Sequence, residues 1–283
     1  MIIARTAPRS LFHLPEIPMS LKTYDTLSLS EPAPHVLQVE LNRPDVRNAL
    51  NTRMGEELRS IFLPLQFTPG DLRCIIITGA GDKAFCAGGD LKERQGMTDH
   101  AWRLQHAIFE EAFYSVMDCS VPVIAAVNGA AFAGGLELAL ASDFIYAADH
   151  ARFALTEVSI GIMPGAGGTQ NLPRAIGERR AKELILSARP FSAQDALAWG
   201  MVNEVVPAAD LLARALETAT RIAGNAPIAV RQAKKSIHTG LQADLKSGLF
   251  FEVQAYDRMI STEDRHEGIN AFNEKRKPKF VGR

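Results

Sequence analysis

The chain has 283 residues, of which 47% are hydrophobic and 22% are charged, the proportions of an ordinary globular protein. Its 31 Lys and Arg residues balance 32 Asp and Glu residues, and the net charge of -1 excludes an overall field that would attract nucleic acid or anionic lipid. The three cysteines, Cys74, Cys86 and Cys119, lack the paired spacing of a zinc site or a disulfide framework, which predicts free thiols in a reducing compartment.

Residues 1–20 are predicted to be an N-terminal extension. They contain Arg5 and Arg9 and no acidic residue before Glu16, a pattern that fits a transit peptide. Because Met19 follows, the same segment also fits an alternative start site. We therefore expect a cytoplasmic protein, with the mitochondrial matrix as the alternative location.

Residues 21–206 show strands and helices in alternation. The apolar residues of Val36–Leu41 alternate with polar ones, which is the period of a half-buried strand. Further strands are predicted at Arg73–Thr78, Val121–Val127 and Phe153–Leu155, and helices at Thr52–Leu65, His100–Cys119, Leu136–Ser142 and Arg174–Leu186. Strand, loop and helix recur, which predicts an α/β fold with buried strands.

The segment Val121–Ala141 is apolar enough to suggest a membrane span. It contains Pro122, Asn128 and Glu137, so a buried core segment is the better interpretation. Asn128-Gly129 is also a hairpin signal, but the helix-like run that follows Gly134-Gly135 favours a strand, a glycine loop and a helix.

Residues 207–283 are expected to form a separate helical region. Helices are predicted at Leu211–Ala223, Pro227–His238 and Asp244–Ile260. Just before this region, Ser192 and Asp195 have the spacing of a capping box at the start of one more helix, and Gly200 suits its end.

Three glycine-rich loops are candidate binding elements because glycine lets a ligand approach the main chain. They are Phe85–Leu91, Asn128–Glu137 and Gly161–Gly168, and none fits a standard nucleotide-binding motif. Backbone amides at helix starts behind Gly88-Gly89 and Gly134-Gly135 would stabilise negative charge on a carbonyl oxygen. The alternative is that each pair only permits close packing of a helix on a sheet.

Two glutamates accompany these loops. Glu137 lies in the apolar run Leu136–Ala141, where a carboxylate is costly unless it is paired or its pKa is raised. Glu157 begins the third glycine loop. Two such carboxylates can divide a proton-transfer reaction, and the alternative is an exposed or ion-paired role for either one.

Other chemistries lack their motifs. The chain has neither a His-Glu-x-x-His zinc motif nor a Gly-x-Ser-x-Gly serine motif, and no metal site is predicted. Cys86 adjoins a glycine loop and is a candidate nucleophile, but no histidine lies near it in the sequence. A packing role for Cys86 is the preferred interpretation.

Four ordered motifs resemble the enoyl-CoA hydratase/isomerase, or crotonase, superfamily. The resemblance covers Tyr24 to Arg283 and is most specific at Asn42–Leu50, Ala84–Leu91, Ile124–Phe144 and Glu157–Gln170. Within the superfamily the chain is most similar to hydratases of the methylglutaconyl-CoA hydratase-like group. The resemblance implies a crotonase-like spiral of ββα units, a C-terminal helical region used in trimerisation, and trimers or dimers of trimers.

The resemblance also implies an activity. It is that of an enoyl-CoA hydratase, which adds water in syn fashion across the 2,3 double bond of an enoyl-CoA thioester in fatty-acid or branched-chain acyl-CoA breakdown. Double-bond isomerisation and acyl-CoA hydrolysis on the same scaffold are the alternatives. The expected partner is the acyl-CoA substrate, with neither nucleic acid nor membrane, and no cofactor is expected because coenzyme A is part of the substrate.

Site residues follow from the resemblance position by position. Gly89 and Gly134 match the residues whose amides form the oxyanion hole for the thioester carbonyl. Glu137 matches the glutamate that activates water for attack at C3, and Glu157 matches the one that delivers a proton to C2. The carbonyl of Ala87 matches a contact to the adenine of CoA.

Further CoA-binding candidates are Arg43 and Arg47 in the first loop, and Phe272 and Lys275 acting from a neighbouring subunit. The basic run Lys275–Lys279 also fits a solvated chain terminus. The sequence departs from typical short-chain hydratases at Gly89, where Ala is common, and at Leu155-Thr156, where Gln-Pro is common. These departures leave the acyl group that the site accepts undefined.

Overall fold

The computed structural model describes residues 23–283, so the predicted extension at residues 1–20 lies outside the described residues. The strands are β1 Leu27–Ala33, β2 Val36–Leu41, β3 Cys74–Gly79, β4 Ala84–Cys86, β5 Val123–Val127, β6 Ala130–Phe132, β7 Phe144–Ala148, β8 Arg152–Ala154, β9 Phe191–Ser192 and β10 Glu204–Val206. The helices are α1 Thr52–Leu65, α2 Leu91–Arg94, α3 Asp99–Met117, α4 Gly134–Leu140, α5 Gly168–Ile176, α6 Glu178–Ser187, α7 Ala193–Ala198, α8 Leu211–Ala223, α9 Pro227–Gly240, α10 Leu245–Ile260 and α11 Glu263–Asn273. Short 3-10 helices are η2 Pro44–Val46, η3 Glu157–Ile160 and η4 Ala208–Asp210.

The strands form two sheets, and from β3 to β8 successive strands belong alternately to one sheet and the other. One sheet has the order β1-β2-β3-β5-β7-β10 and the other β4-β6-β8-β9. Both are parallel except at β1–β2 and β8–β9. The successive pairs β3–β4, β5–β6 and β7–β8 each give one strand to each sheet, so the chain advances as a spiral. This confirms the α/β class and the crotonase-like spiral of ββα units.

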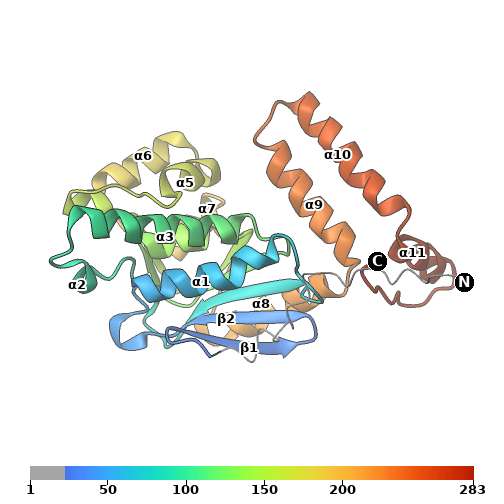
Figure 1. Cartoon of the computed structure of the whole chain (residues 1–283), viewed down its shortest axis with the longest axis horizontal. Coiled ribbons are helices and arrows are strands. Elements are labelled where there is room, and N and C mark those ends of the chain that lie inside the picture. The colour runs from blue at the N-terminus through green and yellow to red at the C-terminus, as the bar shows by residue number, and fades with distance from the viewer. Residues whose placement is uncertain (1–22) are drawn as a thin grey trace, which may run out of the picture.

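The central strands are buried because helices cover the sheets. Every residue of β3 and β5 is buried, as expected for parallel strands rich in Val, Ile and Ala. Helices α1 and α3 pack on each other, and α8 packs on the six-stranded sheet, as Figure 1 shows. The core includes four fully buried phenylalanines, Phe62, Phe85, Phe113 and Phe153.

The interpretation of Val121–Ala141 as core is confirmed, since all of β5, the middle residue of β6 and most of α4 are buried. Asn128-Gly129 forms no hairpin, because β5 and β6 belong to different sheets. No described helix is both long and apolar enough to cross a membrane.

The prediction of a single helix at Arg174–Leu186 is wrong, because two helices, α5 and α6, lie there. Gly177, with φ +84°, ends α5 and separates it from α6, because its left-handed backbone cannot continue a helix. The capping box of Ser192 and Asp195 is confirmed at the start of α7.

The C-terminal helices are largely separate from the core. Helices α9 and α10 pack on each other as an antiparallel pair that projects away from the sheets, and α11 lies close to the C-terminus (Figure 1). The chain end is fastened to α11, because the buried Asp264 carboxylate accepts hydrogen bonds from the amides of Val281 and Gly282. Large apolar side chains remain exposed along the pair: Ile237, Leu241, Leu245, Leu249, Phe250, Val253, Tyr256 and Ile260.

Candidate active site

The three glycine loops meet at a cavity of about 610 Å³. Its lining includes both predicted glutamates and both predicted oxyanion glycines. The lining residues are Leu50, Ala87, Gly89, Leu91, Arg94, Trp102, His106, Phe109, Glu110, Phe113, Ala133, Gly134, Glu137, Thr156, Glu157, Ile160, Ile162, Met163, Gly165 and Ala166. A cavity of this size, lined mainly by apolar residues together with a cluster of ionisable side chains, is typical of a small-molecule site.

Two backbone amides at this cavity have no acceptor among residues 23–283. Leu50 pairs with Gly89 in a parallel bridge, in which the Leu50 amide donates to the Gly88 carbonyl and the Asp90 amide to the Leu50 carbonyl. The Gly89 amide therefore points away from Leu50. Gly134 is the first residue of α4, where an amide has no partner within the helix. A Cβ built on Gly134 would lie 4.0 Å from the Gly89 nitrogen, so both amides border the same space.

The other glycine of each pair serves packing. Gly88 has φ +96°, and a Cβ there would lie 2.8 Å from the Ala133 Cβ. A Cβ on Gly135 would lie 2.0 Å from the Cys86 carbonyl oxygen. Both interpretations of the glycine pairs thus apply, each to a different residue. Ala133 itself has φ 49° and ψ -126°, a strained conformation directly before the Gly134 amide.

Glu137 is held by the third glycine loop. Its side chain is 4% exposed, and its Oε1 accepts hydrogen bonds of 2.8 Å from both the Ala166 and the Gly168 amides. Gly168 is the first residue of α5, so the carboxylate also faces the positive end of a helix. Burial raises the pKa of Glu137, while the two amides and the nearby His106 oppose that rise.

Glu157 is equally buried but is not held in this way. Its side chain is 6% exposed, and neither carboxylate oxygen has a hydrogen-bond partner among the described residues. Burial raises the pKa of Glu157 to about 7, and the charge of Glu137 adds to the effect. Within residues 23–283 neither glutamate is exposed or ion-paired. The alternative prediction, an exposed or ion-paired role for either carboxylate, is therefore wrong.

The sequence analysis missed Arg94 and His106, which line the cavity from α2 and α3. Helical periodicity marked α3 only as a packing helix, and α2 is too short for a periodic signal. His106 Nε2 lies 3.2 Å from Glu110 Oε1, one helical turn further along α3.

The predicted CoA-binding residues are scattered. Ala87 lines the cavity. Arg43 pairs with Asp90 at 2.9 Å and donates to the Ala49 carbonyl, contacts that tie two loops together. Arg47 is exposed. Phe272 lies in α11 and Lys275 lies two residues after its end, and α11 is at the opposite end of the molecule from α2 and α3 in Figure 1.

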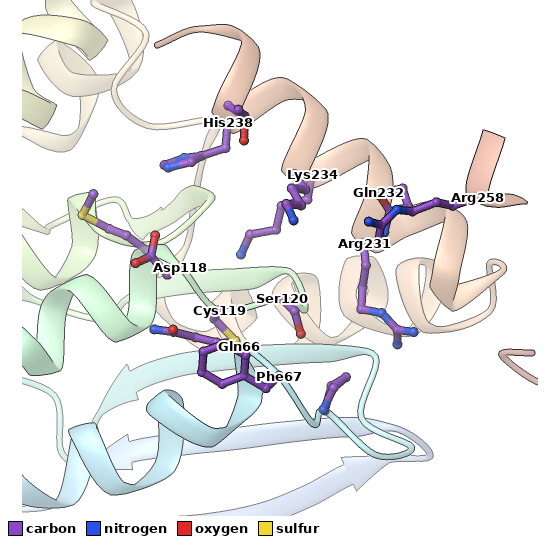
Figure 2. A pocket seen from close by; sticks show the side chains of 14 residues that line it. Gln66, Phe67, Asp118, Cys119, Ser120, Arg231, Gln232, Lys234, His238 and Arg258 are labelled. Atoms are coloured by element: carbon purple, nitrogen blue, oxygen red, sulfur yellow. The ribbon is translucent and has the colours of Figure 1, made fainter. Parts of the chain in front are cut away.

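A second cavity, of about 480 Å³, lies between α9 and the C-terminal ends of α1 and α3. Figure 2 shows Arg231, Lys234 and His238 facing it from α9. Lys234 Nζ is already bound by the Asp143 carboxylate and the Val121 carbonyl. Among its lining residues only Asp118 carries a carboxylate and no glycine occurs, so this cavity lacks the proton-transfer pair and the free amides of the first.

Cys86 is fully buried, and burial raises the pKa of its thiol to about 12. Such a thiol stays protonated and is a poor nucleophile, which supports the packing interpretation.

Comparison with known proteins identifies a family. Residues 31–283 match the model of the family described as enoyl-CoA hydratase/isomerase. Short-chain-enoyl-CoA hydratase of Clostridium acetobutylicum is 40% identical over 242 residues, which cover 86% of this chain and 92% of that protein. Crotonyl-CoA hydratase of Syntrophomonas wolfei is 39% identical over 243 residues, covering 86% and 93%. The crystal structure of enoyl-CoA hydratase from Bacillus anthracis superposes with a TM-score of 0.89 at 48% identity, covering 91% of this chain and all of that one.

Proposed function

Since this chain belongs to the enoyl-CoA hydratase/isomerase family and is an enoyl-CoA hydratase, we propose that Glu137 and Glu157 transfer the protons of the hydration and that the Gly89 and Gly134 amides bind the thioester oxygen. The observation that carries this proposal is the unequal surroundings of the two glutamates. One carboxylate accepts two amide hydrogen bonds and the other accepts none.

The Gly89 and Gly134 amides would act as an oxyanion hole. When water attacks C3 of a 2,3-unsaturated thioester, the electron pair of the double bond shifts toward the carbonyl and negative charge builds up on its oxygen. Donors placed at this oxygen lower the barrier, each by about 3 to 4 kcal/mol. The Gly89 and Gly134 amides border one space and lack protein acceptors among the described residues, so they are available for this oxygen.

The glutamates divide the proton transfers. Hydrogen bonds from Ala166 and Gly168 favour the ionised form of Glu137, which accepts a proton from the attacking water. Glu157, with a pKa near 7, retains a proton in much of the population at neutral pH and donates it to C2. The carbon chain gains one hydroxyl and one hydrogen, and a proton then returns from Glu137 to Glu157.

This reaction uses only side chains, backbone amides and water, so we expect no metal or redox cofactor, with coenzyme A present only as part of the substrate. A chelator should leave the hydration rate unchanged.

A homo-oligomer, trimeric or a dimer of trimers, is part of the proposal. The exposed apolar side chains of α9 and α10 are a surface that a second copy would cover, and we expect Phe272 and Lys275 to contact CoA bound to such a copy. Light scattering should give a mass at least three times that of one chain.

The compartment is a further proposal. We favour the cytoplasm, with the mitochondrial matrix as the alternative, and sequencing the mature N-terminus separates the two. A mature protein that begins at Met1 or Met19 supports the cytoplasm, whereas cleavage within the extension at another residue supports import into the matrix.

The activity is tested with crotonyl-CoA and a 3-enoyl-CoA. Hydration removes the ultraviolet absorbance of the conjugated thioester and yields a 3-hydroxyacyl-CoA. Conversion of the 3-enoyl-CoA to a 2-enoyl-CoA without hydration, or release of free CoA, would instead assign an isomerase or a hydrolase.

A further inference from the structure

Glu137, the base of the proposed mechanism, is held by a loop that is rich in glycine. The Ala166 and Gly168 amides both donate to its Oε1 at 2.8 Å. Both amides belong to residues 161–168, in which positions 161, 165, 167 and 168 are glycine. Glycine leaves the main chain more freedom than any other residue, so other groups must keep these amides directed at one oxygen atom.

The side chain of His106 on α3 lies against this loop at Gly165. A Cβ built on Gly165 would lie 2.6 Å from His106 Cε1 and 2.8 Å from its Nε2, so the imidazole ring fills the space that a side chain at position 165 would take. Gly165 directly precedes Ala166. The ring therefore packs beside the same peptide unit whose amide donates to the Glu137 carboxylate.

His106 is itself held in place by α3. Its Nε2 lies 3.2 Å from Glu110 Oε1, one turn further along this helix. Helix α3 has 19 residues and packs on α1, which makes it a firm support. Near its other end Met117 Sδ accepts a hydrogen bond of 3.6 Å from Asn171 Nδ2 in α5. Helix α3 thus supports the loop at Gly165 and the helix that follows the loop at Asn171.

The charge of His106 also acts on Glu137. Burial raises the pKa of Glu137, and His106 is among the groups that oppose this rise. The other ionisable side chains that line the cavity within the described part of the chain are Arg94, Glu110 and Glu157. Because Glu110 is paired with His106, it offsets most of any positive charge there. The contact with the loop is therefore the main way in which His106 can influence the base.

We infer that His106 is a positioning residue for the hydration, in which its ring, packed against Gly165, keeps the Ala166 amide directed at Glu137 Oε1; this rests on the proposed role of Glu137 as the base. Without the ring, the loop would move and one of the two hydrogen bonds to the carboxylate would weaken. Since His106 acts through Glu137 rather than on the substrate, its removal should change kcat more than KM.

The test measures kcat, KM and the pH profile of kcat/KM on crotonyl-CoA for wild type, His106→Ala and His106→Gln. His106→Ala should lower kcat roughly tenfold, about the worth of one charge-assisted hydrogen bond, and leave KM nearly unchanged. A weaker amide contact raises the pKa of Glu137, so the loss of activity on the acidic side should begin at a higher pH. His106→Gln has a side chain of similar length without the charge and should recover most of kcat.

A double variant separates this role from a general effect on the fold. Glu137→Gln cannot accept the proton, so the direction of the Ala166 amide no longer matters for its residual rate. Adding His106→Ala to Glu137→Gln should therefore cause no further loss. His100→Ala, an exposed histidine near the start of α3 that does not line the cavity, is the matched control and should have the wild-type kcat.

Three results would overturn the inference: a wild-type kcat in His106→Ala, an equal loss in His106→Ala and His106→Gln, or a further tenfold loss in the double variant. The second result would assign the effect to the charge of His106, and the third to the fold. A wild-type rate in Glu137→Gln alone would instead contradict the proposed function, because Glu137 would then not be the base.

Discussion

Glu137 on α4 and Glu157 at the start of η3 are buried to nearly the same degree in one cavity, yet their surroundings differ. The start of α5 supplies two amides to Glu137, while no described donor reaches Glu157. Burial alone makes a carboxylate hard to ionise, and only hydrogen bonds or charges can offset it. In the proposed mechanism, the main chain of the third glycine loop, rather than burial, makes Glu137 the base and Glu157 the acid.

The largest expected effect comes from removing either carboxyl group. Glu137→Gln and Glu157→Gln should each lower the hydration rate by roughly a hundred- to ten-thousand-fold, because in the proposed mechanism each residue transfers a proton. The measurement is kcat/KM on crotonyl-CoA, with circular dichroism to verify folding. A near-wild-type rate in either variant would remove that glutamate from the mechanism.

The next effect is on stability and concerns Glu157 alone. Its pKa is about 7 in the folded protein against an ordinary 4.5, so the folded state holds the proton more tightly than the unfolded state. Stability is therefore lost as the pH rises from about 4.5 to about 7, by about 3 kcal/mol in total. Glu157→Gln removes this loss and should raise the free energy of unfolding by that amount at pH 8 and by little at pH 4.5.

Denaturant unfolding at fixed protein concentration measures this difference. Glu137→Gln is the matched comparison. Its free energy of unfolding should rise less at pH 8 than that of Glu157→Gln, because the substitution weakens two charge-assisted amide hydrogen bonds. An equal rise in the free energy of unfolding of the two variants would show that the hydrogen bonds to Glu137 do not set it apart from Glu157.

The smallest effect is expected from Gly168→Ala. The added Cβ would lie 2.9 Å from Glu137 Oε1 and 2.9 Å from the Pro164 Cβ, so it should displace the carboxylate from its amide donors. We expect a loss of roughly tenfold in kcat, about the worth of one charge-assisted hydrogen bond. Gly224→Ala, at the end of α8 with only ordinary contacts, is the control and should have wild-type kcat.

Much of the fold follows from the sequence because its signals are local. Helices α1 and α8 have the predicted bounds, and the buried strands β3 and β5 were found from their apolar runs. Strands β4 and β6 have three residues each, too few for a period to show. They exist because neighbouring strands of the second sheet pair with them.

The candidate site was predictable in its residues but not in its electrostatics. A glutamate in an apolar run signalled burial, and paired glycines signalled exposed amides. That Ala166 and Gly168 donate to Glu137 depends on a contact across about 30 residues that no local pattern records. Arg94 was missed for the same reason, since its position at the cavity depends on contacts with Gln105 and Trp102 rather than on its own neighbours in sequence.

The pH dependence of kcat/KM, measured for wild type and Glu157→Gln from pH 5.5 to 9, tests the central claim most directly. If Glu157 must carry a proton, the wild-type value should fall roughly tenfold per pH unit above about 7, and the residual activity of Glu157→Gln should lack that fall. A wild-type value that stays level to pH 9, or the same fall in Glu157→Gln, would contradict the assignment of the acid to Glu157.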